Sequence, residues 1–89
     1  MKSQVRTIHQ CEIYYEFDRD DANKCVDKVE KFAFDFSFIK RWNVKIETQG
    51  YGAAFFPCVT VQSENKDLLI RCATQIENYI KRFSGYKIS

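Results

Sequence analysis

Residues 11–36 have the sequence CEIYYEFDRDDANKCVDKVEKFAFDF, and this stretch decides the fold. Its first part has an apolar residue at every second position, which is typical of a strand with one covered face: Cys11, Ile13, Tyr15 and Phe17. Beyond a charged break, apolar residues recur every three or four positions, as in an amphipathic helix: Ala22, Cys25, Val26, Val29, Ala33 and Phe36. The stretch therefore predicts a strand followed directly by a helix that covers the sheet.

The break between these two elements is acidic, with Asp18, Asp20 and Asp21 around Arg19. Such residues at a helix start supply an N-cap and negative charge that the helix dipole favours, so we expect the helix to begin near Ala22. The three aspartates could also hold a hard cation, but they lack the length and spacing of a calcium loop. We therefore expect capping here, with no metal site and no cofactor.

The middle of the chain repeats the two-residue period twice, on either side of Gly50-Tyr51-Gly52. Residues 42–48, which begin with Trp42, and residues 55–61 carry alternating apolar side chains, so they predict two strands joined by a hairpin. Pro57 cannot donate a ladder hydrogen bond, and we expect it at a strand start, a bulge or an unpaired side.

The last third of the chain predicts a second helix. Residues 63–65 offer possible caps, and Gly85 fits a helix stop. One stripe of the helix is apolar and is expected to face the sheet: Leu69, Cys72, Ala73, Ile76, Ile80 and Phe83. Residues 86–88 could add a short last strand.

This order of elements matches a ferredoxin-like α+β sandwich, in which two helices cover one face of an antiparallel sheet. We expect a single domain over residues 1–89, frayed at residues 1–6 and 86–89. The first and third strands are central in this plan, so their apolar side chains are expected to meet the helical stripes in the core. A very short last strand would leave part of an edge unpaired, which makes dimerisation through a sheet edge an open alternative.

Composition and charge narrow the class of protein. The 89 residues are 45% hydrophobic and 29% charged, which suits one folded domain. No apolar stretch approaches the roughly 18 residues needed to span a bilayer. Cys11, Cys25, Cys58 and Cys72 show no metal or redox spacing. We therefore expect reduced cysteines, a cytoplasmic location and no membrane partner.

Catalysis has little support in the sequence. His9 is the one histidine, and the chain lacks the spaced motifs of nucleophilic, phosphate-binding and zinc-dependent enzymes. His9 and Cys11 face the same way on the first strand, but no third group orients them. We expect no catalytic residues.

Residues 34–42 contain more apolar side chains than the helical stripe can place. Aromatic residues together with arginine have the composition of binding hot spots. We therefore expect a partner-binding surface here, formed by Phe34, Phe38, Lys40, Arg41 and Trp42. The alternative is that Trp42 and the phenylalanines close one end of the core.

The segment QGYGAAFF, residues 49–56, resembles the third-strand ribonucleoprotein motif of RNA recognition motif domains, which have the same order of strands and helices. The resemblance implies that aromatic residues on the sheet surface stack on bases. The residues concerned would be Tyr14, Tyr51 and Phe56, with Lys45 beside them. The alternative is that the two glycines form a hairpin turn, which explains the same residues without any role in RNA binding.

Three function classes follow. The leading hypothesis is a small intracellular, non-enzymatic binding or regulatory module that acts by protein–protein contact or self-association. The second is an RNA or single-stranded nucleic-acid binder that uses the open sheet face. The third is a regulatory dimer that senses a small molecule, similar in plan to ACT-type domains, and it rests on topology alone.

Overall fold

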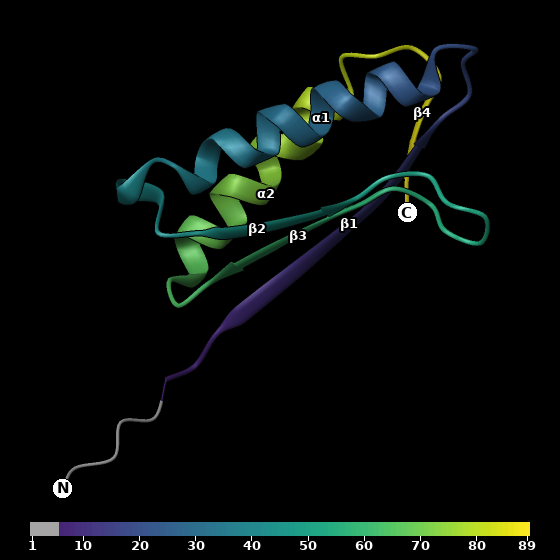
Figure 1. Cartoon of the computed structure of the whole chain (residues 1–89). Coiled ribbons are helices and arrows are strands. Elements are labelled where there is room, and N and C mark those ends of the chain that lie inside the picture. Colours follow the sequence, from purple (N-terminus) through teal and green to yellow (C-terminus); the bar gives the residue numbers. More distant parts are fainter. Residues whose placement is uncertain (1–5) are drawn as a thin grey trace, which may run out of the picture.

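The computed structural model describes residues 6–89. The elements follow one another as β1 (His9–Phe17), α1 (Ala22–Ser37), a 3-10 helix η1 (Lys40–Trp42), β2 (Lys45–Gln49), β3 (Cys58–Ser63), α2 (Lys66–Ile80) and β4 (Tyr86–Ile88). The sheet has the order β2-β3-β1-β4, and every neighbouring pair is antiparallel. Both helices pack on it from the same side (Figure 1). The predicted ferredoxin-like α+β topology is confirmed.

The C-terminal residues form a paired strand, β4, which confirms the short last strand expected at residues 86–88. Tyr86, Lys87 and Ile88 pair with the last three residues of β1, and the Ser89 nitrogen donates to the Tyr14 carbonyl at 2.9 Å. The expected fraying of residues 1–5 lies outside the described residues. Within residues 6–89, neither helix combines the length and hydrophobicity needed to cross a bilayer.

The core lies between the sheet and the helices, as predicted. The alternating residues of β1 and β3 bury Ile13, Tyr15, Val59 and Val61 against both helices. Five residues of the predicted second stripe are buried on α2, and Cys72, Ile76 and Ile80 have no accessible surface. The sixth, Phe83, lies beyond the end of α2 and is half-buried. Burying an aliphatic side chain of the size of isoleucine stabilises a fold by about 1.5–3 kcal/mol.

A row of aromatic rings, each in contact with the next, connects both helices with β1: Trp42, Phe36, Phe32, Tyr79, Phe83, Phe17 and Tyr15. Phe32 and Tyr79 stack face to face with centroids 4.2 Å apart, whereas the other contacts are edge-on. Such pairs contribute about 0.5–1.5 kcal/mol beyond their burial. The aromatic row therefore places Phe32, Phe36 and Trp42, whereas Phe34 and Phe38 are exposed and do not belong to it.

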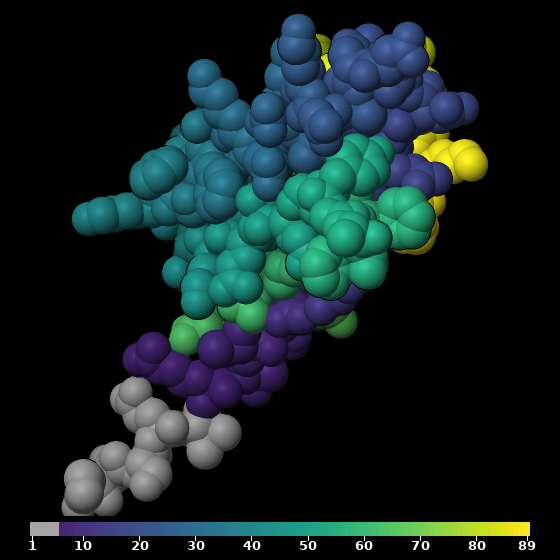
Figure 2. All heavy atoms as spheres, turned by 45° about the vertical axis from the view of Figure 1, so that its right-hand side comes forward, coloured from purple at the N-terminus to yellow at the C-terminus, as the bar shows by residue number. Residues whose placement is uncertain are grey.

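Two strands begin later than predicted. Trp42 lies in η1 rather than in a strand, because Asn43, with a φ of 49°, takes a left-handed conformation that ends the turn. β3 begins at Cys58, so Phe55 and Phe56 belong to the hairpin loop. Pro57 precedes the strand, and its carbonyl accepts a hydrogen bond from the Tyr15 nitrogen at 3.1 Å. Figure 2 shows the hairpin loop, in blue-green, on the surface of the molecule.

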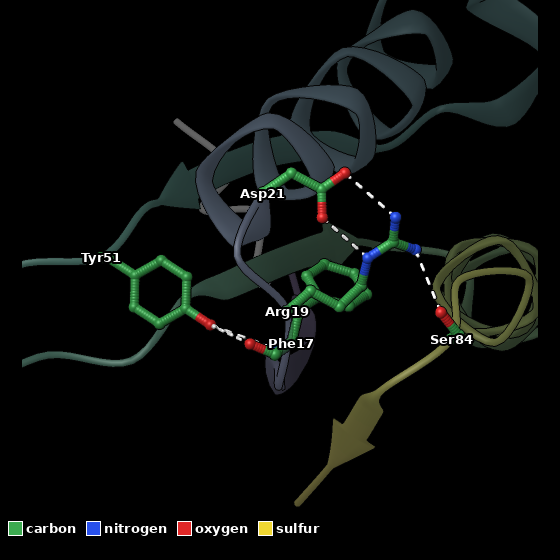
Figure 3. A network of polar contacts seen from close by, with 5 residues as sticks. All are labelled: Phe17, Arg19, Asp21, Tyr51 and Ser84. Carbon is green, nitrogen blue, oxygen red and sulfur yellow. Dashed lines mark hydrogen bonds and ion pairs between the residues drawn. The ribbon is translucent and has the colours of Figure 1, made fainter.

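The acidic break does not cap α1 as predicted. Asp21 occupies the N-cap position, but its side chain makes no hydrogen bond to the helix. Its two carboxylate oxygens instead accept hydrogen bonds from Arg19 at 2.8 and 3.0 Å, and Arg19 also donates to Ser84 Oγ (Figure 3). The break therefore connects the start of α1 with the chain that follows α2.

Candidate functional site

The C-terminal end of α1 exposes three apolar side chains. Phe38 is 81% exposed, Ile39 is 40% exposed and Phe34 is 38% exposed. We call these three residues the apolar patch. Because phenylalanine is among the residues most often buried, the exposure of Phe38 is the feature of this surface that packing does not explain.

Hydrogen bonds hold the backbone of the apolar patch in one conformation. The Phe38 nitrogen donates to the Asp35 carbonyl at 3.3 Å, and the Ile39 nitrogen donates to the Phe36 carbonyl at 3.2 Å. Ile39 is extended, and this change of direction after Ser37 takes the chain off the buried stripe of α1. Phe38 is therefore exposed on an ordered turn.

Two cations border the apolar patch. Lys40 and Arg41 are exposed in η1, and neither forms an ion pair with another residue between 6 and 89. Trp42 differs from both, since it is half-buried and packs edge-on against Phe36 with ring centroids 4.9 Å apart. Of the five residues predicted to bind a partner, the structure thus places four at the surface and Trp42 in the aromatic row.

An open depression of about 610 Å³ adjoins the apolar patch. Ile39 and Ile8 contribute apolar surface to it, and Lys40 and Lys45 contribute positive charge. Its lining comes from the end of α1, η1, the start of β2, the end of β3 and the chain before β1: Arg6, Ile8, Ser37, Ile39, Lys40, Asn43, Val44, Lys45, Gln62, Ser63 and Glu64. Sequence reasoning missed Ile8, because it precedes the alternating pattern of β1.

The residues of the nucleic-acid alternative do not form one platform. Tyr14 lies on the open face of the sheet opposite Cys58, whereas Lys45 is opposite Gln62, four positions or about 13 Å further along β3. Phe56 was predicted on the sheet surface and lies instead in the hairpin loop. The Tyr51 hydroxyl is hydrogen-bonded to the backbone of Phe17.

The open face of the sheet around Tyr14 carries negative charge. The Tyr14 hydroxyl donates to Glu12 Oε2 at 3.0 Å, and this hydrogen bond raises the pKa of Tyr14. Glu47 lies close by and forms an ion pair with Lys45 at 3.5 Å. Carboxylates at these positions oppose the approach of a phosphate backbone.

The four cysteines are free, and Cys25, Cys58 and Cys72 are buried while Cys11 is half-buried. Burial raises the pKa of Cys72 to about 11 and also raises that of Cys11. These two thiols therefore stay protonated and weakly nucleophilic at neutral pH. Over residues 6–89, no group of three or more His, Cys, Asp or Glu side chains is placed to hold a metal ion.

The chain is thus a ferredoxin-like α+β domain that exposes phenylalanines at two places, in the hairpin loop at Phe55 and Phe56 and in the apolar patch. The apolar patch is the one followed directly by two exposed cations, Lys40 and Arg41. The sequence of the chain matches no protein-family model and no curated protein. The function proposed below therefore depends on the fold and surfaces of the molecule alone.

Proposed function

We propose that this chain is a non-enzymatic interaction module that binds a protein partner through the apolar patch and the cations beside it. The exposure of Phe38 on a hydrogen-bonded turn carries the proposal. A side chain presented on an ordered backbone loses little conformational freedom on binding, so more of its contact energy appears as affinity. Aromatic and arginine residues are the commonest anchors of such interfaces.

The charges around the apolar patch specify the partner's chemistry. Lys40 and Arg41 are not neutralised by a carboxylate of residues 6–89, whereas Lys45, which also lines the depression, is paired with Glu47. Opposite charges at the rim of an interface speed association and fix its register. The partner is therefore a protein segment with carboxylates next to an apolar side chain that contacts Phe38 and Ile39.

Selection of peptides from a random displayed library on the immobilised protein tests this proposal. We expect enriched peptides that combine acidic and apolar residues. The double variant Phe38→Ser, Arg41→Glu should weaken their binding at least tenfold and unfold at nearly the same temperature as the wild type. The matched control Ile70→Ser, Arg71→Glu changes an exposed isoleucine and an exposed arginine of α2, and it should bind like the wild type.

Three results would count against the proposal. Equal binding by the Phe38→Ser, Arg41→Glu variant places the interface elsewhere. Unfolding of that variant assigns Phe38 to the core. Binding of a mixed oligonucleotide that weakens steeply with salt and is lost in Tyr14→Ala supports nucleic-acid binding instead.

A further inference from the structure

Each part of β1 pairs with a neighbouring strand, but the first part pairs on one side and the last part on the other. β3 pairs with residues His9 to Tyr14 of β1, and β4 pairs on the other side with Tyr15 to Phe17 alone. Among residues 6–89, no strand lies beside residues 9–13 on the β4 side. In Figure 1 this first half of β1 extends to the lower left, away from β4. We call it the open edge of β1.

The hydrogen bonds of β1 show which backbone groups point to its open edge. Asp18 donates to the Gly85 carbonyl at 2.7 Å and Tyr14 accepts from the Ser89 nitrogen, so even-numbered residues face β4. Tyr15 donates to the Pro57 carbonyl, so odd-numbered residues face β3. Because these directions alternate along a strand, the N–H and C=O groups of Gln10 and Glu12 point to the open edge.

This edge has few of the features that normally protect an edge strand from pairing. Proteins protect such edges with charged side chains, lysine above all, with proline or with bulges. Residues 9–13 have the sequence HQCEI, in which Glu12 is the one acidic or basic residue besides His9, and their pairing with β3 is continuous without a bulge. β2, the other edge of the sheet, carries the exposed Lys45–Glu47 ion pair.

We propose that the open edge of β1 binds the same edge of a second copy of this chain, in antiparallel orientation about a two-fold axis at Cys11. Ser89 limits the space beside β1, because it occupies the edge at Tyr14. A register centred on Cys11 fits residues 9–13 of both copies into the remaining length and uses only residues that are already in the strand. The two sheets then join into one.

The side chains favour the register centred on Cys11 over the registers centred on Glu12 or on Gln10. Gln10 comes to lie opposite Glu12 of the second copy, and its amide can donate across the axis as it does within one chain, where Gln10 Nε2 lies 2.9 Å from Glu12 Oε1. A register centred on Glu12 would oppose two like charges, which destabilises a strand pair. A register centred on Gln10 would require Thr7 and Ile8, which lie outside β1, to join the strand.

In this register the two copies of Cys11 lie close enough to be joined by a disulfide. The backbone groups of Cys11 face β3, so the two copies of Cys11 form a non-hydrogen-bonded pair with α-carbons about 4.5 Å apart. This separation lies within the range that a disulfide spans, roughly 4.4–6.8 Å. Diamide, which takes up the two hydrogen atoms released by two thiols, should therefore join the copies through Cys11.

Sedimentation equilibrium over a concentration series, with circular dichroism to check folding, tests the interface. The wild type should reach twice the mass of the monomer. Glu12→Pro removes one N–H from the open edge and leaves the ladder to β3 intact, so this variant should stay monomeric. The matched control Thr48→Pro should dimerise. Thr48 is opposite Val59, whose backbone groups face β1 as those of Pro57 do, so the Thr48 N–H points away from β3.

Several outcomes would overturn the inference. They are a monomeric wild type at all concentrations, a dimeric Glu12→Pro variant, or loss of the dimer in Thr48→Pro, which would place the interface on β2. Should Glu12→Pro unfold, diamide treatment of the wild type and Cys11→Ser decides: a linked dimer only in the wild type supports the interface, and equal linkage in both excludes it. The Phe38→Ser, Arg41→Glu variant should dimerise normally, which separates this inference from the proposed function.

Discussion

The hydroxyl of Tyr51 accepts a hydrogen bond from the backbone nitrogen of Phe17 at 2.9 Å (Figure 3). The ladder between β1 and β3 would place residue 55 opposite Phe17, but the chain leaves the sheet before Cys58 and forms the hairpin loop. The Tyr51 side chain therefore replaces a missing strand partner. Its hydroxyl also lies 3.5 Å from the Phe17 carbonyl oxygen, so it can serve both backbone groups.

Replacing Tyr51 with phenylalanine should lower the free energy of unfolding by about 1 kcal/mol, because the partly buried Phe17 N–H loses its acceptor. Urea denaturation followed by circular dichroism measures the change. Tyr86→Phe is the control, since no hydrogen bond of the Tyr86 hydroxyl is present within residues 6–89. An unchanged Tyr51→Phe variant would show that water satisfies the Phe17 nitrogen equally well.

Replacing Tyr15 with phenylalanine should have the opposite effect. The Tyr15 hydroxyl is buried and has no hydrogen-bond partner among the described residues, and its burial raises the pKa of Tyr15. A buried hydroxyl without a partner costs about 1–3 kcal/mol. We expect Tyr15→Phe to raise the free energy of unfolding by about 1 kcal/mol in the same urea assay, and a clear loss of stability would reveal a partner for the hydroxyl.

The period of the apolar residues was enough to predict the topology of this chain. β1 and β3 alternate cleanly and α2 has one continuous stripe, so local pattern and tertiary packing agree for these elements. The open edge of β1 also follows from the shortness of residues 86–88. Where the spacing of apolar residues agrees with the tertiary packing, one sequence is enough to predict a strand or a helix.

The surface at the end of α1 was harder to predict, because its residues have similar chemistry and different environments. Phe36 and Trp42 pack into the aromatic row, whereas Phe38 is exposed. The difference depends on the turn at Ile39 and on the left-handed conformation of Asn43. Neither backbone conformation can be predicted from the spacing of the apolar residues. Phe56 was misplaced for a related reason, since alternation continues from the hairpin loop into β3 without a break.

Truncating Ile76 to alanine should lower the free energy of unfolding by about 2–5 kcal/mol, because the side chain is fully buried and its removal leaves a cavity. Ile70 is the matched control, since it lies on the same helix and is 52% exposed. Ile70→Ala should change stability by less than about 0.5 kcal/mol. A loss below about 1 kcal/mol for Ile76→Ala would contradict the packing of α2 against the sheet.

Cys72 should make the protein less stable at alkaline pH. Burial, followed by the nearby Cys11, raises the pKa of Cys72 from 9.0 to about 11, so the fold favours the neutral thiol. The stability that this preference contributes is complete below the pKa of the unfolded chain and is lost as the pH rises from about 9 to about 11.

Comparison of the wild type with Cys72→Ala isolates this contribution, because the tyrosines and lysines titrate in both proteins. Urea midpoints measured from pH 7 to pH 11 under reducing conditions should fall more steeply above pH 9 in the wild type. At neutral pH, Cys72→Ala should be the less stable protein, since it loses a buried side chain. Parallel pH curves for the two proteins would mean that the Cys72 thiolate is solvated within the folded state.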